Sequence, residues 1–551
     1  MTGVVLVAAF AAALVLLPAT GAQSTTTTTL PTLASPVRTV TGPPAVSGPI
    51  RAPGGPYLYD RAGRVVFFHG VNAVYKRPPY ELYPAPGKPW NLSAADASMM
   101  AQLGFNVVRL GMTWSGLEPG TAPANDPAIC APGTPADPHQ FDRAAFDRYV
   151  AHLRSTVALL GRFHIYTILD MHQDVYNEAF DGEGAPRWAV CTDGVPSRDP
   201  PGRWSRNYGT AAAGIAYDHF WRNDVRGDLQ GEYIRIWGMV ARTFRSDPWV
   251  LGYDPFNEPF SKALVTLGDE NFDAQLECFY TGTTHIGSPL HGAPPLTCPP
   301  GDPPDGVIPT ILGADPSHLI FDEPDNYTSR GFPTYLGPMN LPNLVFNVHV
   351  YCGARSPVTG NPTNFDRCTD EEIRSLKNSD EDRTDMASPA QPNGPPWIVS
   401  EFGATSDPAL LGFLTAQMDA EQVGWAYWAW KHYDDPTGSL DEALVTAAGQ
   451  VRPTALVLSR VYPQAVAGTP VSFDYAPFSG VFHLAYVPDL RIQAPTVVFV
   501  PTRLRYPSSY CATVRGGRIT SRPGASELTV QNVRAGHRVS VEVRPGRCRS
   551  R

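Results

Sequence analysis

The feature that most constrains this chain is an alternation of short apolar runs with helical sequence, repeated eight times between about residues 65 and 430. The runs are rich in β-branched and aromatic residues, which is typical of buried strands. They are Val65–Val74, Asn106–Trp114, His164–Asp170, Val250–Asn257, Leu319–Asp322, Leu344–Tyr351, Trp397–Glu401 and Gly424–Trp430. Strands that alternate with helices form a parallel sheet, and eight such units predict an α/β fold closed into a (β/α)8 TIM barrel.

Helical patterns fill the intervals between these runs. They are clearest at Ala94–Leu103, Phe141–Leu160, Leu229–Phe244 and Pro408–Ala420. Gly104 and Gly161 stand where the first two helices would need C-terminal caps. The lengths of these segments match the helical layer that surrounds a barrel.

The sequence changes character past about Arg452, where no helical period appears. β-forming residues gather between Pro and Gly turns at Val471–Tyr475, Val481–Tyr486, Thr496–Val500, Arg518–Thr520, Leu528–Val530 and Arg538–Val543. A region of this size and pattern predicts a small C-terminal β-sandwich. We therefore place the barrel in residues 50–455 and the β-sandwich in residues 456–551.

The N-terminal residues have the composition of an export signal. The stretch from Val4 to Leu17 is continuously apolar, and small residues up to Ala22 supply a cleavage site. Residues 1–22 are thus predicted to be a signal peptide, and the Thr- and Pro-rich residues 23–49 a flexible linker. Because residues 1–3 lack Lys and Arg, an uncleaved N-terminal anchor stays open as the alternative to a secreted protein.

The eight cysteines fit an oxidised, exported protein. Closure of short loops favours the pairs Cys278–Cys298, Cys352–Cys368 and Cys511–Cys548. No CxxC motif or Cys/His spacing typical of a zinc site is present, and we predict no metal and no organic cofactor.

The charge balance excludes one class of function. The chain has 43 Lys and Arg against 52 Asp and Glu, a formal net charge of −9. Binding to a phosphate backbone depends largely on clustered Lys and Arg, so a nucleic-acid partner is not expected. We expect a monomer.

Two glutamates close predicted strands at the edge where a barrel carries its active site. Glu258 ends the fourth run, and Glu401 ends the seventh. Two carboxylates facing each other across a barrel mouth meet the needs of glycosidic cleavage, in which one protonates the leaving oxygen and the other attacks the anomeric carbon.

These residues carry a resemblance to a known family. The motifs Asn257-Glu258-Pro259 and Glu401-Phe402-Gly403 resemble the paired signatures of the retaining glycoside hydrolases of family five, in clan A. The positions that follow the family pattern in order are Arg109, His172, His349, Tyr351 and Trp428. Within the family, Gly70–Lys76, Asp170–Asp174 and the appended β-domain most resemble the endoglycoceramidases.

The resemblance implies a role for each residue of the catalytic pair and its neighbours. Glu258 would be the general acid/base, and Glu401 the nucleophile. Asn257 would hold the sugar 2-OH. Arg109 and Tyr351 would favour the anionic form of Glu401.

It also implies a set of sugar-binding residues. His172 and His349 would hydrogen-bond sugar and carboxyl groups, while Lys76 and Asp174 would bind sugar hydroxyls. Trp428 would form the platform beneath a glucose ring.

The resemblance thus implies a retaining β-glycosidase that releases an intact glycan from ceramide. Its partner would be a glycosphingolipid in membranes or micelles, and peripheral contact with the membrane surface stays open. Two alternatives also stay open: a glucanase, mannanase or β-glucosidase of the same family, and a non-catalytic barrel that binds glycans or lipid surfaces.

Two further residues have competing interpretations. Glu323 also ends an apolar run but lacks a preceding Asn, so we interpret it as structural or peripheral. Trp430 lies two residues beyond Trp428 on the same strand and could replace it as the platform. Asn326-Tyr327-Thr328 fits the sequence for N-glycosylation.

Overall fold

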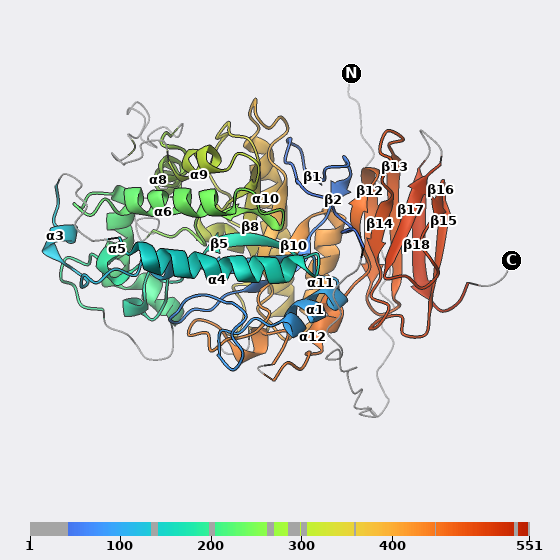
Figure 1. Cartoon of the computed structure of the whole chain (residues 1–551), viewed down its shortest axis with the longest axis horizontal. Coiled ribbons are helices and arrows are strands. Elements are labelled where there is room, and N and C mark those ends of the chain that lie inside the picture. Colours follow the sequence, from blue (N-terminus) through green and yellow to red (C-terminus); the bar gives the residue numbers. More distant parts are fainter. Residues whose placement is uncertain are drawn as a thin grey trace, which may run out of the picture. The chain divides into compact units, whose positions relative to one another are not determined.

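Eight parallel strands form a closed barrel in the computed structural model, which confirms the predicted fold (Figure 1). The structure describes residues 42–133, 141–197, 204–261, 269–284, 298, 306–356, 360–446, 448–533 and 538–548. The barrel strands, in spatial order, are β3 (His69–Ala73), β4 (Val107–Met112), β5 (Tyr166–Met171), β6 (Val250–Asp254), β7 (Leu319–Asp322), β8 (Leu344–Val350), β9 (Trp397–Phe402) and β10 (Gly424–Tyr427). Every residue of these strands is buried, because side chains fill the barrel on one face and helices cover the other.

Helices connect successive barrel strands. The longer ones are α1 (Ala94–Leu103), α4 (Arg143–Gly161), α5 (Ala211–Arg222), α6 (Leu229–Phe244), α8 (Asp269–Thr281), α9 (Val307–Ala314), α10 (Phe365–Asp385) and α11 (Pro408–Ala420). Short helices are α2 (Trp114–Leu117), α3 (Pro127–Cys130) and α12 (Thr454–Leu458). Gly104 caps α1 with a left-handed φ of 95°, as predicted. The prediction for Gly161 was wrong, since that residue is the last of α4 and the cap is Arg162.

Two antiparallel sheets form the predicted β-sandwich. One contains β1 (Leu58–Tyr59), β2 (Val65–Val66), β11 (Tyr462–Val466), β14 (Thr496–Phe499), β17 (Glu527–Asn532) and β16 (Gly517–Ile519). The other contains β12 (Gly468–Ala476), β13 (Val481–Pro488), β18 (Val539–Pro545) and β15 (Tyr510–Arg515). Side chains from both sheets pack in one apolar cluster, and β12 alternates buried and exposed residues as a one-sided strand should.

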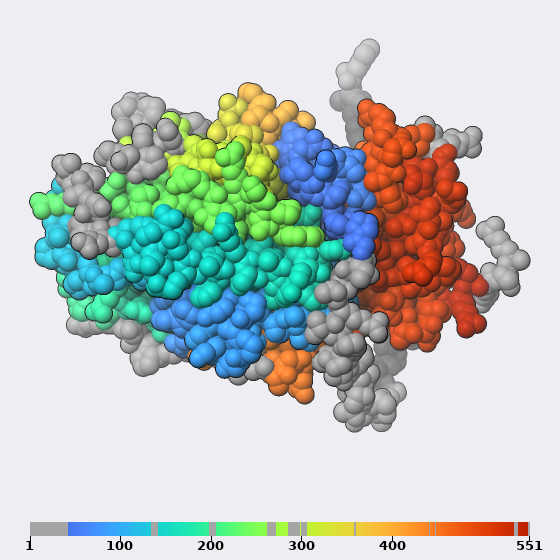
Figure 2. Space-filling view, in the orientation of Figure 1, coloured from blue at the N-terminus to red at the C-terminus, as the bar shows by residue number. Residues whose placement is uncertain are grey.

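The sequence pattern mistook two strands for one at Val65–Val74. Val65 and Val66 form β2 and pair with β11 of the C-terminal region, whereas β3 begins only at His69. The N-terminal part of the described chain, blue in Figure 2, therefore lies against the orange and red C-terminal strands. This pairing ties the β-sandwich to the end of the barrel opposite the carboxyl ends of its strands.

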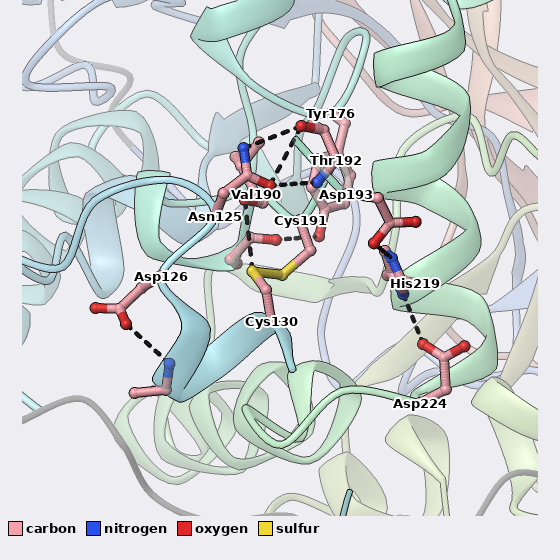
Figure 3. Close-up of a disulfide and its surroundings, with 12 residues drawn as sticks. Asn125, Asp126, Cys130, Tyr176, Val190, Cys191, Thr192, Asp193, His219 and Asp224 are labelled. Atoms are coloured by element: carbon pink, nitrogen blue, oxygen red, sulfur yellow. Dashed lines mark hydrogen bonds and ion pairs between the residues drawn. A yellow bond between two sulfur atoms is a disulfide. The ribbon is translucent and has the colours of Figure 1, made fainter. Parts of the chain in front are cut away.

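Four disulfides are present, and the three predicted pairs are confirmed. The fourth, Cys130–Cys191, spans 61 residues and joins the segments that follow β4 and β5 (Figure 3). Close to it, His219 of α5 lies between Asp193 and Asp224, with ring nitrogen to carboxylate distances of 3.1 and 2.7 Å. The disulfide and this ionic contact hold the outer parts of two long loops.

Among the residues that the structure describes, no helix has both the length and the apolar character needed to cross a bilayer. The predicted signal peptide lies outside the described residues, as does the predicted linker as far as residue 41. The final part of that linker is described, and Val46 is buried beneath the barrel with Phe68 and Val107.

We predict that one buried histidine makes stability depend on pH. The His69 ring stacks between Trp425 and Tyr462, at centroid distances of 4.1 and 3.8 Å. Neither of its ring nitrogens has a hydrogen-bond partner among the described residues. Burial, assisted by the nearby Arg460 guanidinium, lowers the pKa of His69 well below its usual 6.5.

Below about pH 6.5 the unfolded chain therefore binds a proton at His69 that the folded chain does not bind. The free energy of unfolding should fall by about 1.4 kcal/mol for each pH unit below that point. The neutral His69 ring contributes its full stabilisation above pH 6.5, and this contribution is lost as the pH falls. Urea unfolding of wild type and His69→Phe at pH 7.5 and 5.5 tests this. A smaller loss in the variant is expected, and equal losses would contradict the assignment.

Candidate active site

Two glutamates meet at the carboxyl ends of the barrel strands, where the fold carries its active sites. Glu258 follows β6, and Glu401 lies in β9. One carboxylate oxygen of each, together with a ring nitrogen of His349, lies within 4.8 Å of the others. Carboxyl groups about 5–5.5 Å apart are typical of retaining glycosidases, and gaps of about 6.5–9.5 Å are typical of inverting ones. Oxygens of the two carboxylates within 4.8 Å of each other fit the shorter spacing of the retaining arrangement.

Arg109 of β4 organises the floor of this site. Its guanidinium is fully buried and contacts four carboxylates and one amide oxygen at 2.6–3.1 Å. These partners come from or directly after four other strands and are Asp170, Asp254, Asn257, Glu323 and Glu401. Burial opposes the charged form, but the surrounding carboxylates outweigh it and raise the pKa of Arg109.

Glu401 receives the two contacts that the sequence predicts. Arg109 Nη1 lies 2.6 Å from its Oε1, and the Tyr351 hydroxyl donates to its Oε2 at 2.9 Å. Burial nevertheless raises the pKa of Glu401, while His349 and Arg109 act in the opposite direction. The predicted contacts are thus present, but they offset only part of the cost of burying Glu401.

Glu258 is held on both of its carboxylate oxygens. His349 Nδ1 lies 2.9 Å from Oε1, and Asn326 Nδ2 donates to Oε2 at 2.9 Å. The backbone N–H of Glu258 donates to Glu323 at 2.8 Å. Burial opposes protonation of His349, but Glu323 and Glu401 raise its pKa well above the ordinary value.

A second polar cluster adjoins the catalytic pair. Lys76 forms an ion pair with Asp174, and its ammonium also lies 3.7 Å from Glu183. His172 connects the two clusters, because its Nδ1 lies 2.7 Å from Asp170 and its Nε2 lies 3.8 Å from Asp174. Burial opposes the charged form of His172, yet Asp170 and Asp174 raise its pKa to about 10.

Trp428 lies beside this second cluster. The His172 ring stacks on its indole at 5.3 Å, and the Lys76 ammonium lies 4.4 Å from the ring centroid. The Trp428 Nε1 donates to Glu442 at 3.2 Å. Trp430, in contrast, is fully buried and donates to Asp96 behind the barrel mouth, so it does not reach the site.

Comparison with known proteins decides the family. The model described as "Cellulase (glycosyl hydrolase family 5)" matches residues 79–284 and 302–434, and the "Glycoside hydrolase family 5 C-terminal domain" matches residues 460–543. The chain belongs to glycoside hydrolase family 5.

Several relatives of this glycoside hydrolase share most of its length. Endoglycoceramidase I of Rhodococcus hoagii is 28% identical over 89% of this chain and 88% of its own. The endoglycoceramidase of Cyanea nozakii is 26% identical over 83% of this chain and 85% of its own. The solved lactosyl-enzyme intermediate of endo-glycoceramidase II from Rhodococcus sp. has a TM-score of 0.65 at 22% identity, covering 89% of this chain and all of that one.

The glycoside hydrolase fold brings all the predicted site residues to one end of the barrel. One group surrounds the catalytic pair and comprises Arg109, Asn257, Glu258, His349, Tyr351 and Glu401. The other surrounds Trp428 and comprises Lys76, His172 and Asp174.

Sequence reasoning missed several residues of the site. Asn326 carries no signal beyond a glycosylation sequence, and Glu183 lies in a loop with no strand-end position. Glu323 is central rather than peripheral, since one oxygen lies 2.7 Å from Arg109 and the other receives the Glu258 N–H. Its position directly after β7 was the signal that could have identified it.

Two groups of three side chains have ligand atoms close enough together to hold a metal ion. One is His172, Asp174 and Glu183, and the other is Glu258, His349 and Glu401. Each already contains or contacts a cationic side chain. Lys76 pairs with the first group and Arg109 with the second. The absence of a metal and of an organic cofactor stays a prediction.

We predict that Lys76 stabilises the fold as well as the site. It is almost completely buried against the carboxylates of Asp174, Glu183 and Asp435. Lys76→Met would leave buried charge without a partner, so the free energy of unfolding should fall by about 3–5 kcal/mol.

Urea denaturation at pH 7 measures this effect. Adding Asp174→Asn to Lys76→Met should recover part of the loss, because the orphaned charge is then removed. Lys377→Met, at an exposed position of α10, is the matched control and should change stability by less than about 0.5 kcal/mol. A double variant no more stable than Lys76→Met would refute the account.

Proposed function

We propose that the chain is a retaining β-glycosidase that hydrolyses the bond between the glycan and the ceramide of glycosphingolipids. The observation that carries the chemistry is the pair Glu258 and Glu401, with oxygens within 4.8 Å at the barrel mouth. The names of the relatives support the substrate class, since three that match over most of their length are endoglycoceramidases.

In the first step Glu401 attacks the anomeric carbon, the bond from that carbon to the ceramide oxygen breaks, and Glu258 gives its proton to the departing oxygen. In the second step Glu258 takes a proton from water. The water oxygen bonds to the anomeric carbon, and the bond to Glu401 breaks. The two glutamates are restored and the glycan leaves with its original anomeric configuration.

The surrounding residues prepare this reaction. Asn257 is fixed at both ends of its amide, by Arg109 at 2.8 Å and by the Gln173 carbonyl at 2.9 Å, which suits a residue that must hold a sugar 2-OH. Lys76, His172 and Asp174 provide donors and acceptors for sugar hydroxyls beside the Trp428 ring.

A row of aromatic residues favours an apolar leaving group over a polysaccharide. Phe260 lies two residues after Glu258 and packs on Tyr327 with ring centroids 6.4 Å apart. Tyr327 in turn packs on Phe332 at 6.2 Å, and Phe332 is 52% exposed. These packed rings place apolar surface near the segment that carries Glu258, which suits a lipid leaving group, whereas a glucan or mannan needs sugar platforms on both sides of the bond.

Product analysis tests the proposal directly. Wild-type protein with lactosylceramide in detergent should release intact lactose and free ceramide, detected by mass spectrometry. Glu401→Gln and Glu258→Gln should each lower the rate by at least about 10³-fold, because the nucleophile or the proton donor is lost.

Glu421→Gln, at the end of α11, makes the same chemical change outside the site and should retain activity. Cleavage of cello- or manno-oligosaccharides without lipid cleavage would overturn the substrate but keep the mechanism. Inactivity on every substrate would favour a non-catalytic glycan- or lipid-binding barrel.

We also propose that the chain is exported, acts as a monomer and meets its substrate at a membrane surface or in micelles. The support for export is the four disulfides, which persist in oxidising compartments. Expression in a secreting host should yield protein in the medium whose N-terminus is Gln23, as determined by N-terminal sequencing. Membrane-bound protein that retains residues 1–22 would instead establish the uncleaved anchor.

A further inference from the structure

The loop after β7 encloses Glu258 from two directions. Asn326 donates its side-chain amide to Glu258 Oε2 at 2.9 Å, and its backbone N–H donates to the Pro259 carbonyl at 2.9 Å. Three residues earlier, Glu323 accepts the Glu258 backbone N–H at 2.8 Å. A short segment of one loop therefore holds both the backbone and the side chain of the proposed acid/base.

Glu323 is itself firmly held. Its Oε1 lies 2.7 Å from Arg109 and 3.2 Å from the Asn347 amide nitrogen, and its backbone carbonyl accepts the Tyr280 hydroxyl at 2.7 Å. Burial favours its neutral form, but His349 and Arg109 outweigh burial and lower the pKa of Glu323 to about 2. Glu323 is thus a fixed anion at neutral pH.

These contacts make the two oxygens of Glu258 different. The amide N–H of Asn326 occupies Oε2 as an acceptor, so the oxygen of Glu258 that can exchange a proton with His349 is Oε1. Oε1 faces His349 Nδ1 at 2.9 Å, while His349 Nε2 lies 3.3 Å from Glu323. Two other charged groups lie near this histidine. Glu401 Oε2 is 3.6 Å from its Nδ1, and Arg109 contacts both Glu401 and Glu323.

We propose that Asn326 and Glu323 are positioning residues for the acid/base Glu258. Asn326 reserves Oε2 as an acceptor, and Glu323 anchors the backbone of Glu258 and orients His349, so that Oε1 and His349 Nδ1 share one transferable proton. That proton passes to the leaving oxygen in the first step, and one proton from water replaces it in the second. This inference rests on the proposed function and adds to it two residues that the family signature did not identify.

The apparent glycosylation sequence at Asn326 has a different explanation in this arrangement. The side-chain nitrogen to which a glycan would be joined is the donor to Glu258 Oε2. The residue is therefore placed for its hydrogen bond to the proton donor.

Leaving-group dependence separates a positioning role from a merely structural one. A substrate with a good leaving group needs little protonation, whereas one with a poor leaving group depends on it. We would measure kcat/KM for 2,4-dinitrophenyl β-lactoside and 4-methoxyphenyl β-lactoside with wild type, Asn326→Ala and Asn378→Ala. Asn378 of α10 is the matched control. Its amide donates to the carbonyl of Gly331, which lies between β7 and β8 as Asn326 does, and it does not contact Glu258.

For Asn326→Ala, kcat/KM on the methoxyphenyl substrate should fall about 10- to 100-fold, and kcat/KM on the dinitrophenyl substrate should stay within about threefold of wild type. Asn378→Ala should leave both within about twofold. Equal losses on the two substrates, or no loss, would overturn the proposal.

The pH profile provides a second, independent readout with variants of nearly unchanged shape. Asn326→Asp places a carboxylate against Oε2, so the alkaline limb of kcat/KM should move to higher pH. Glu323→Gln removes a negative charge near Glu258 and His349, so the same limb should move to lower pH. Shifts in the same direction, or none, would contradict the assigned roles.

Glu258→Gln, measured on the same methoxyphenyl substrate, separates the two levels of the argument. If it retains full activity, the proposed function fails. If it is inactive while Asn326→Ala and Glu323→Gln behave as wild type, only the positioning roles fail. Thermal unfolding of each variant establishes that the compared proteins are folded.

Discussion

The structure depends on one buried cation. The guanidinium of Arg109 lies inside the barrel and donates to Asp170, Asp254, Glu323 and Glu401, which come from or follow four different strands. Burying one carboxylate without a partner costs several kcal/mol, so four at one barrel end would be incompatible with a stable fold unless a shared donor satisfied them. The planar guanidinium can do this because it presents five N–H groups in fixed directions.

The charges of the site follow from this arrangement. Because Arg109 is engaged by Glu401 and Glu323, His349 is the basic side chain that contacts Glu258. The second cluster repeats the principle with Lys76, whose ammonium is surrounded by Asp174, Glu183 and Asp435. Each cation holds its carboxylates in place, and the Lys76 ammonium also lies 4.4 Å from the Trp428 ring centroid.

Much of this was accessible from sequence. The eight barrel strands, the four clearest helices and three disulfides follow from local patterns or short chain separations, and the structure has them where expected. Glu258 and Glu401 were also accessible, because strand-end carboxylates have a defined place in a barrel. Asn326 was not, since its role comes from a loop that folds back over another strand end. The division of Val65–Val74 was hidden for a similar reason, because both halves are equally apolar and only their partners differ.

By itself, the sequence determined the period of the strands and helices, the two glutamates proposed as the catalytic pair, and the family to which the chain belongs. These properties depend on residue types and spacings along the chain. The tertiary structure alone decided which carboxylates share Arg109, which oxygen of Glu258 faces His349, and that Glu323 and Asn326 contact Glu258. Such properties depend on distances between side chains far apart in sequence, and closure of the barrel is what brings those side chains together.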